Sequence, residues 1–408
     1  MWFEFAVIAI VFEILFELYL DYRQLRHLRS VKEPVDIFKA DITQEEFKKS
    51  VDYQVACTTF SMWSTVLGMG IVSPFIVKLL WDITRYGNEI IHSIIFTCFT
   101  TLIESIVSIP FSYYKKFVID EKFGFNNSTI KLFVTDNIKS FFLNSIISSI
   151  LYSALVWLYH WAGPKFIPTA FAFFFGFMVL LQVLYPIIIM PLFTKLSPLP
   201  DGDVKTTINK LAEETKFNLK EIYQTDDSKR SSKQNAFMMG LFTHKVALAD
   251  TLLEKCSPEE IKAVVGHEIG HSKHNHIWKL IFINMAGFAI TCASLQLIMK
   301  HQIVFNDFGF FDEMPIVIGL TLTTFIATPI SQLLQLPLNM LIRHFEYQAD
   351  EFAASRGLKL EEALLKISQE NKSAVEPEYI YSAFNDSHPT LFQRVTAIRE
   401  IQRKSKHD

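Results

Sequence analysis

Long apolar segments constrain the fold of this 408-residue chain more than any other feature. The clearest is residues 171–181, which read Phe-Ala-Phe-Phe-Phe-Gly-Phe-Met-Val-Leu-Leu. A helix needs about 20 apolar residues to cross the hydrocarbon core of a bilayer. Seven segments meet this requirement, at 3–20, 57–80, 90–110, 141–162, 167–192, 278–299 and 315–341. The sequence therefore predicts a mainly α-helical membrane protein with seven transmembrane helices, in contact with the lipid bilayer.

The composition supports this class and argues against others. Charged residues make up 20% of the chain, below the roughly 25% of soluble proteins. A net charge of −3 provides no basic surface for phosphates, so no nucleic-acid partner is expected. The four cysteines lack the spacing of a disulfide framework or a metal site.

Lysine and arginine are concentrated in alternate loops, and this pattern predicts the orientation of the spans. The loops after the first and third spans are rich in both, as are the segment 193–277 and the tail after 342. The opposite loops contain few, with Arg85 in one and Lys165 in another. Because cytosolic loops carry the excess of positive charge, we expect an outer or lumenal N-terminus and a cytosolic C-terminus.

Two polar stretches are long enough to fold outside the bilayer. They divide the chain into four parts: five spans and their loops at 1–194, a first cytosolic part at 195–277, two spans at 278–341, and a second cytosolic part with the tail at 342–408. Both polar parts are predicted on the same side of the membrane. We therefore expect them to form one soluble domain.

A His-Glu-x-x-His motif at residues 267–271 indicates a metal site. Ser257 and Glu260 form a capping-box pattern that predicts a helix through this segment. His267 and His271 are four residues apart, so both rings project from one side of that helix and can share one Zn²⁺. Glu268 can reach a metal-bound water as general base. We interpret the following His274 and His276 as residues at the surface or where the chain enters the membrane, and not as ligands.

A protease-type zinc site needs a third protein ligand and one open position. Glu346 follows the seventh span and is the candidate ligand, with Asp350 one turn later as an acceptor for a ligand imidazole. Zinc would lower the pKa of a bound water to about 7, and Glu268 would pass its proton to the leaving amine. His388 is a candidate donor to the oxyanion.

Several further segments occur in the same order as in a known family. They are residues 117–126, 185–186, 191–195, 198–202, 228–232, 235–237, 250–253, 266–271, 343–350 and 387–389. With these motifs the chain resembles the type I CaaX prenyl proteases, which are integral-membrane zinc metalloendopeptidases of the endoplasmic reticulum. The resemblance implies seven helices around a chamber, capped by a cytosolic α+β domain of the gluzincin-like zinc metalloprotease class.

The resemblance also implies roles for individual residues. One Zn²⁺ per chain would be bound by three ligands: His267, His271 and Glu346. Glu268 would be the base, Asp350 the supporting carboxylate and His388 the donor to the oxyanion. Three residues would contact or position the substrate: Asn235, Ala236 and Arg343. The implied reaction is removal of the C-terminal tripeptide from prenylated CaaX proteins, with a second upstream cleavage on some substrates.

The chain departs from the family pattern at several positions. Lys233 and Gln234 stand where the family usually has His and Ser, and Phe237 stands where it has Tyr. Ser272 replaces a usual Trp, and His344 a usual Arg. No zinc ligand or base is lost, but the departures near Asn235 put the substrate preference in question.

Two other functions remain open from the sequence. One is a zinc protease for quality control of membrane proteins, and the other is a non-enzymatic membrane chamber or translocon-clearing factor with a structural zinc. The tail Lys-Ser-Lys-His-Asp at 404–408 resembles a retrieval signal. We expect a monomer in the endoplasmic reticulum membrane, and the resemblance extends the location to the inner nuclear membrane.

Overall fold

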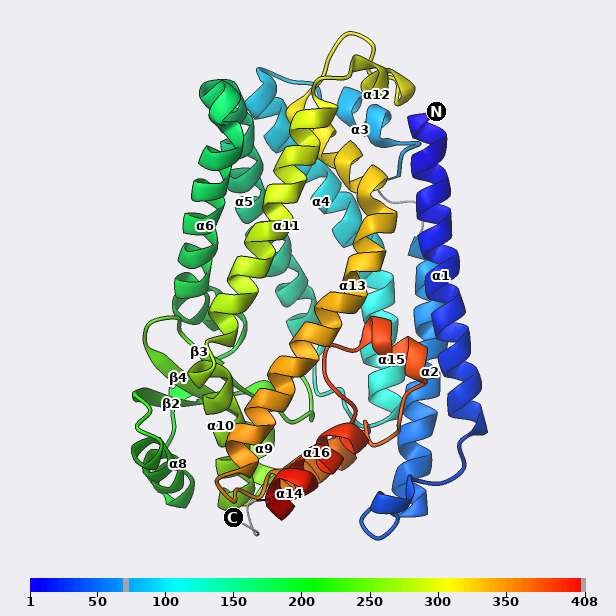
Figure 1. Ribbon diagram of the computed structural model, residues 1–408. Coiled ribbons are helices and arrows are strands. Elements are labelled where there is room, and N and C mark those ends of the chain that lie inside the picture. The colour runs from blue at the N-terminus through cyan, green and yellow to red at the C-terminus, as the bar shows by residue number, and fades with distance from the viewer. Residues whose placement is uncertain (69–72, 405–408) are drawn as a thin grey trace.

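The structure is a computed structural model that describes residues 1–68 and 73–404. Long helices run side by side through most of its height, and a small sheet with shorter helices gathers at the lower end (Figure 1). The long helices are α1 (Trp2–Ser30), α2 (Gln44–Gly68), α4 (Glu89–Tyr114), α5 (Ile130–Ala162), α6 (Phe166–Leu184), α11 (His276–Ile298) and α13 (Ile316–Ala354).

Four segments of the described chain are long and apolar enough to cross a membrane: Glu89–Asp120, Ile130–Phe193, His276–Ile298 and Ile316–Ala354. They contain α4, both α5 and α6, α11, and α13. The helices α1 and α2 are outside this set, because acidic residues interrupt α1 and polar residues dilute α2. The predicted span 57–80 is not one helix in the described residues, since α2 ends at Gly68 and α3 (Val77–Ile83) is separate.

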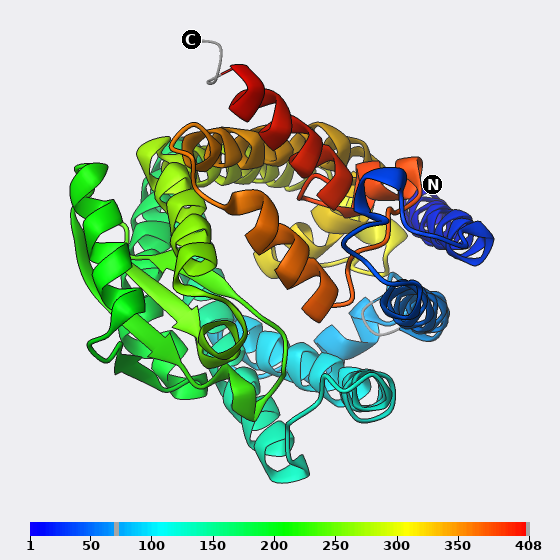
Figure 2. The ribbon, with the colours of Figure 1, turned by 90° about the horizontal axis from the view of Figure 1, so that it is seen from below.

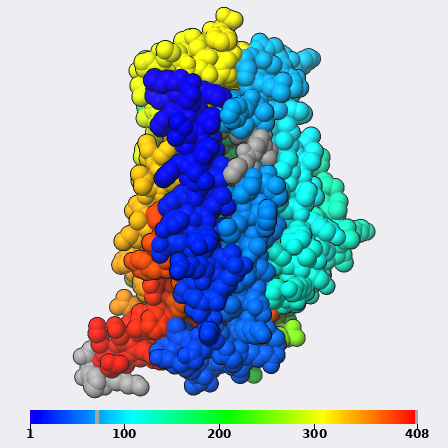
Figure 3. All heavy atoms as spheres, turned by 90° about the vertical axis from the view of Figure 1, so that its right-hand side faces the viewer, coloured from blue at the N-terminus to red at the C-terminus, as the bar shows by residue number. Residues whose placement is uncertain are grey.

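Glu13 and Glu17 on α1 are neighbours of α13. The Gln332 side-chain amide donates to Glu13 Oε1 at 2.9 Å and to Glu17 Oε1 at 3.4 Å. Figure 3 shows α1 running the height of one face, between α2 and the segments of α13 and α15 (Tyr379–Asn385). These two acidic residues of the first predicted span therefore meet a polar partner on a neighbouring helix.

Short elements complete the connections. Two π-helical segments, Lys115–Asp120 and Tyr185–Ile189, extend α4 and α6, and 3-10 turns occur at Asp36–Phe38, Gly163–Lys165 and Asp227–Lys229. The remaining helices are α7 (Met190–Phe193), α8 (Asp203–Glu214), α9 (Asp250–Lys255), α10 (Pro258–Lys273), α12 (Gln302–Asp307), α14 (Leu360–Glu370) and α16 (Leu391–Lys404). Residues 405–408 of the predicted retrieval signal lie outside the described chain.

The sheet has the strand order β1-β2-β4-β3. Its strands are β1 (Leu196–Pro198), β2 (Leu219–Thr225), β3 (Ala236–Met239) and β4 (His244–Ala249). The β1–β2 and β3–β4 pairs are antiparallel and β2–β4 is parallel. This order leaves β3 at an edge of the sheet.

The two largest hydrophobic cores of the described residues lie in different parts of the molecule. One packs apolar side chains of α1, α4, α5, α11 and α13 against each other. The other joins Ile208, Ile261 and Ala353 with Ile398 of α16. Side chains from 199–269 and from 352–401 thus share one core, although α11 and most of α13 separate these stretches in sequence. Figure 2 shows the same elements from below, with α14 and α16 on the side facing the viewer.

Candidate metal centre and active site

The helix α10 carries the His-Glu-x-x-His motif and is fixed at its start. Ser257 accepts from the Glu260 backbone N–H, and the Glu260 side chain accepts from the Ser257 backbone, which completes the expected capping box. Ile261 and Val265 are fully buried. Gly270 packs so closely on α13 that a Cβ there would lie 2.9 Å from Ala349 Cα. This close approach brings the motif against α13.

Three predicted ligands converge at this contact. His267 Nε2 and His271 Nε2 are 3.1 Å apart. The Glu346 carboxylate lies 3.6 Å from the first nitrogen and 3.3 Å from the second. Glu346 follows the predicted seventh span on the same helix, because α13 continues without a break to Ala354. A continuous helix holds the third carboxylate rigidly opposite the two rings.

Asp350 is completely buried one turn beyond Glu346 and contacts His267. The His267 Nδ1–H donates to Asp350 Oδ1 at 2.8 Å, which leaves the Nε2 lone pair free to point at Glu346. Arg394 of α16 neutralises the same carboxylate, with Nε 2.8 Å from Oδ2 and Nη2 2.6 Å from Oδ1. Arg394 was not predicted from the sequence, because nothing local distinguishes it from other arginines.

His276 corrects a sequence-based interpretation. We expected it at the surface or at the membrane boundary, but it is 2% exposed and stacks on Phe345. Its Nε2 lies 2.9 Å from Gln348 Oε1, and its Nδ1 lies 2.8 Å from His271 Nδ1. Since the amide oxygen can only accept, Nε2 carries the His276 proton and Nδ1 accepts from His271. His276, the first residue of α11, is therefore buried, and it supports His271, the second histidine of the motif.

The three donor atoms fit a metal ion. Both histidines donate through Nδ1 to supporting residues, so both Nε2 lone pairs face a carboxylate. Glu346 Oε2 is buried and accepts no well-aligned hydrogen bond, although His388 Nδ1 lies 2.9 Å away. The ligand atoms of His267, His271 and Glu346 all lie within 4.8 Å of one another. Three electron-rich atoms this close repel each other unless a cation lies between them, and two imidazoles with one carboxylate are typical ligands of catalytic zinc.

The predicted base, Glu268, is located between the metal ligands and the sheet. Its Oε2 accepts from the Met238 backbone N–H at 3.1 Å. Met238 belongs to the edge strand β3, which begins at Ala236, and Asn235 directly before the strand is exposed. The predicted base therefore contacts β3 two residues beyond the predicted substrate residue Ala236.

His388 lies in the connection between α15 and α16. The neighbouring Glu346 carboxylate raises the pKa of His388. Arg343 fixes this connection, because its guanidinium donates to the carbonyl oxygens of Ser382 and Asp386, the latter through both Nε and Nη2. The structure thus ties Arg343 to the chain segment that carries His388.

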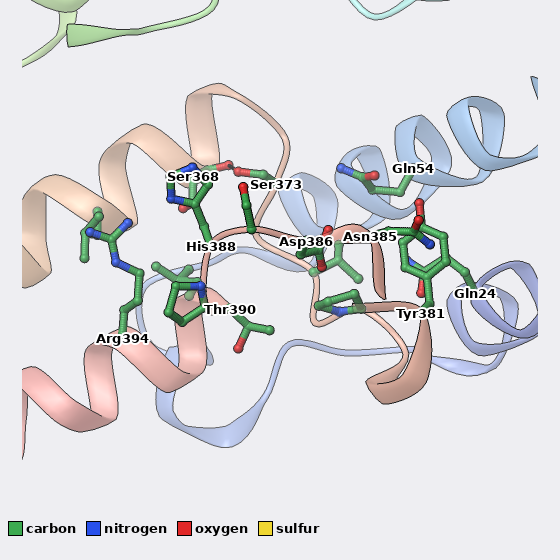
Figure 4. A pocket seen from close by; sticks show the side chains of 16 residues that line it. Gln24, Gln54, Ser368, Ser373, Tyr381, Asn385, Asp386, His388, Thr390 and Arg394 are labelled. Atoms are coloured by element: carbon green, nitrogen blue, oxygen red, sulfur yellow. Dashed lines mark hydrogen bonds between the residues drawn. The ribbon is translucent and has the colours of Figure 1, made fainter. Parts of the chain in front are cut away.

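A cavity of about 480 Å³ adjoins the site. Arg394 and His388 lie at one end of it, and Gln24, Gln54 and Tyr381 at the other (Figure 4). It extends the site toward α1 and α2, which the sequence motifs alone did not connect with the metal ligands.

The fold and this site define a membrane-embedded metallopeptidase. A family model described as the CAAX prenyl protease N-terminal region with five membrane helices matches residues 24–195, and peptidase family M48 matches residues 198–402. The chain belongs to the CAAX prenyl protease 1 family within these metallopeptidases, as near full-length relatives show.

Among these relatives is the CAAX prenyl protease 1 homolog of Arabidopsis thaliana, 37% identical, with 96% of each chain covered. CAAX prenyl protease 1 of Saccharomyces cerevisiae is 34% identical, with 96% of this chain and 94% of the relative covered. The crystal structure of S. mikatae Ste24p superposes with a TM-score of 0.90 at 32% identity, covering 97% of this chain and 98% of that one.

Proposed function

We propose that this protein is a zinc-dependent endoprotease that removes the C-terminal tripeptide from prenylated CaaX proteins. The names of the full-length relatives support the substrate class. The single observation that carries the proposal is the position of Glu268 between the cluster of His267, His271 and Glu346 and the edge strand β3. A peptide bond lying along β3 would be within reach of both.

The roles of the residues follow from their contacts. The zinc ion would be held by His267, His271 and Glu346. When bound, it acts as a Lewis acid and lowers the pKa of a bound water. Glu268 takes the proton of the attacking water and delivers it to the leaving amine. His388 donates a hydrogen bond to the developing oxyanion from beside Glu346.

Other residues position these groups or the substrate. Asp350 fixes the His267 tautomer, and Arg343 fixes the connection that carries His388. Asn235 and Ala236 offer side-chain and backbone hydrogen bonds to an extended peptide. Strand addition of this kind reads a peptide mainly through its backbone, with little demand on sequence.

We further propose the arrangement in the membrane. Seven long helices, α1, α2, α4, α5, α6, α11 and α13, would span the bilayer and enclose a chamber, with one Zn²⁺ in a cytosolic domain. The charge bias of the loops supports a lumenal N-terminus and a cytosolic C-terminus. The family supports the endoplasmic reticulum membrane, and we propose a monomer.

The decisive experiment is release of the tripeptide from a farnesylated CaaX peptide by the detergent-purified full chain. Glu268→Gln and a metal chelator serve as controls. We expect both to abolish release, and an unprenylated peptide to be a poor substrate. Equal cleavage of unprenylated peptides and unfolded proteins would instead identify a quality-control protease. If the folded, zinc-loaded protein cleaves none of these peptides and proteins, the non-enzymatic function is favoured.

A further inference from the structure

We propose that Lys233 and Lys372 form a subsite for the free C-terminal carboxylate of the substrate, at a point where Asn371 closes the edge of β3. This inference rests on the proposed function of the same site. The subsite would identify the chemical group that the enzyme recognises beyond the cleaved bond. It would also give a structural reason why the released fragment is short.

The open edge of β3 ends at Gln234. In a strand, every second residue directs its backbone N–H and C=O to the same side. Met238 directs its N–H to Glu268, and Gln234 directs its N–H to Asn371 Oδ1 at 2.9 Å. Asn371 Nδ2 also donates to the Gln234 carbonyl at 3.2 Å. The Asn371 amide therefore occupies the edge in the manner of a partner strand.

Ala236 lies between these two occupied positions. By the same alternation its backbone groups face the edge, where a substrate strand would pair. Each strand residue advances about 3.3 Å, so Gln234 is about 7 Å from Ala236 along the strand. A peptide paired with Ala236 has room for two or three residues before it meets Asn371. A longer fragment would have to leave the line of β3.

Two lysines flank this closed end. Lys372 follows Asn371 directly, and its Nζ lies 4.0 Å from the centroid of the Phe125 ring. Lys233 precedes Gln234, and its Nζ lies 4.8 Å from the same centroid. Both ammonium groups thus gather over one aromatic ring, next to the residue that closes the edge.

These cations lack carboxylate partners. In residues 1–68 and 73–404, neither Lys233 nor Lys372 forms an ion pair. Lys233 Nζ donates to the Tyr53 hydroxyl at 2.9 Å, and Asp120, which that hydroxyl also contacts, is paired with Lys115 at 2.5 Å. Burial lowers the pKa of Lys233 and of Lys372. Holding half-buried cations without an anion costs free energy. A substrate carboxylate would offset that cost.

The placement of charge also selects the direction of the substrate. The negative end of a CaaX peptide is its C-terminus, so that end lies at Lys233 and the upstream residues lie toward Met238. This direction is antiparallel to β3, and antiparallel pairing is the more stable arrangement. Ser373, adjacent to Lys372, lines the cavity that also contains His388 (Figure 4). The closed end and the catalytic groups therefore border one continuous space.

The carboxylate subsite gives a functional reason for Lys233, which stands where the family usually has histidine. A histidine is largely neutral at pH 7, whereas a lysine remains charged even after a moderate pKa shift. A charged hydrogen bond to a carboxylate is stronger than a neutral one. This chain should therefore depend on a free C-terminal carboxylate more strongly than relatives with histidine.

The test compares two farnesylated peptides of the same sequence, one ending in a free carboxylate and one in a carboxamide. We expect the KM of the full-length zinc-loaded protein to be about tenfold higher for the amide. Lys233→Met should raise the KM for the acid to that of the amide, with kcat for both nearly unchanged. Lys372→Met should act in the same direction, and Lys233→Arg should retain the preference.

Lys210→Met is the matched control, because this lysine is 70% exposed and belongs to α8, which packs on β2, and β4 separates β2 from β3. It should leave both KM values unchanged. If Lys233→Met and Lys372→Met both preserve the acid-to-amide ratio of KM, the carboxylate subsite is wrong, while chelator-sensitive cleavage still upholds the proposed function. If the unaltered protein cleaves neither peptide, the proposed function itself fails, and the subsite with it. Lys372→Met is decisive should Lys233→Met not fold.

Discussion

The Nδ1 atoms of His271 and His276 lie 2.8 Å apart, so a buried histidine outside the His-Glu-x-x-His motif fixes the tautomer of a predicted metal ligand. We expect His276→Phe to lower zinc affinity about 10- to 100-fold, the usual effect of losing such a supporting residue. Phenylalanine keeps the stacking on Phe345 but accepts no hydrogen bond. Competition with a chromophoric chelator measures the affinity. His274→Phe, at an exposed position of the same turn, should have no effect, and equal losses in both variants would contradict the assignment.

The ion pair between Asp350 and Arg394 predicts a large loss of stability when it is broken. Arg394→Met leaves the fully buried Asp350 carboxylate without its guanidinium partner, which should lower the free energy of unfolding by about 3 to 5 kcal/mol. Chemical denaturation in a mild detergent measures this change. Arg399→Met on the same helix removes an arginine that is 42% exposed and should cost less than about 1 kcal/mol. A similar loss of stability in both variants would show that the buried pair between Asp350 and Arg394 stabilises the protein no more than an exposed one.

The contact of Gly270 with Ala349 predicts that the metal centre is sensitive to a single methyl group. Gly270→Ala would push α10 away from α13 and should destabilise the protein by about 1 to 3 kcal/mol. Because the two helices carry opposite sides of the ligand set, zinc content should fall as well. Gly287→Ala in α11 is the control, since a Cβ there meets nothing within 4 Å. Full zinc occupancy in Gly270→Ala, measured by elemental analysis, would refute this coupling.

The hydrogen bonds of Arg343 predict a catalytic defect without loss of metal. Arg343→Lys cannot donate from two nitrogens to the Asp386 carbonyl and should release the connection that carries His388. We expect kcat to fall about tenfold or more with unchanged zinc content and an unchanged midpoint of metal removal. Combining it with His388→Ala should add little to the defect of His388→Ala alone. Independent, multiplicative losses would place Arg343 in a different role.

Much of the candidate metal site could be predicted from the sequence, because the spacing of its residues is a local property of the chain. The spacing of His267 and His271 on one helical face follows from 3.6 residues per turn, and the capping box of Ser257 sets where that helix starts. Glu346 and Asp350 have the same spacing, and the apolar length of the surrounding segments indicated membrane helices. These features depend on residues that are close together in the chain, so they can be predicted from the sequence.

The supporting contacts depend on distant parts of the chain. Arg394 reaches Asp350 because α16 packs on α13, and His276 turns inward because Gln348 offers an acceptor on another helix. Asn371 closes β3 only because the end of α14 lies beside Gln234. Sequence by itself determined most of the long helices and the residue types of the candidate ligands, through local periodicity. Only the tertiary structure decided which buried polar groups are paired, because each such group must find a partner wherever packing of the whole chain places one.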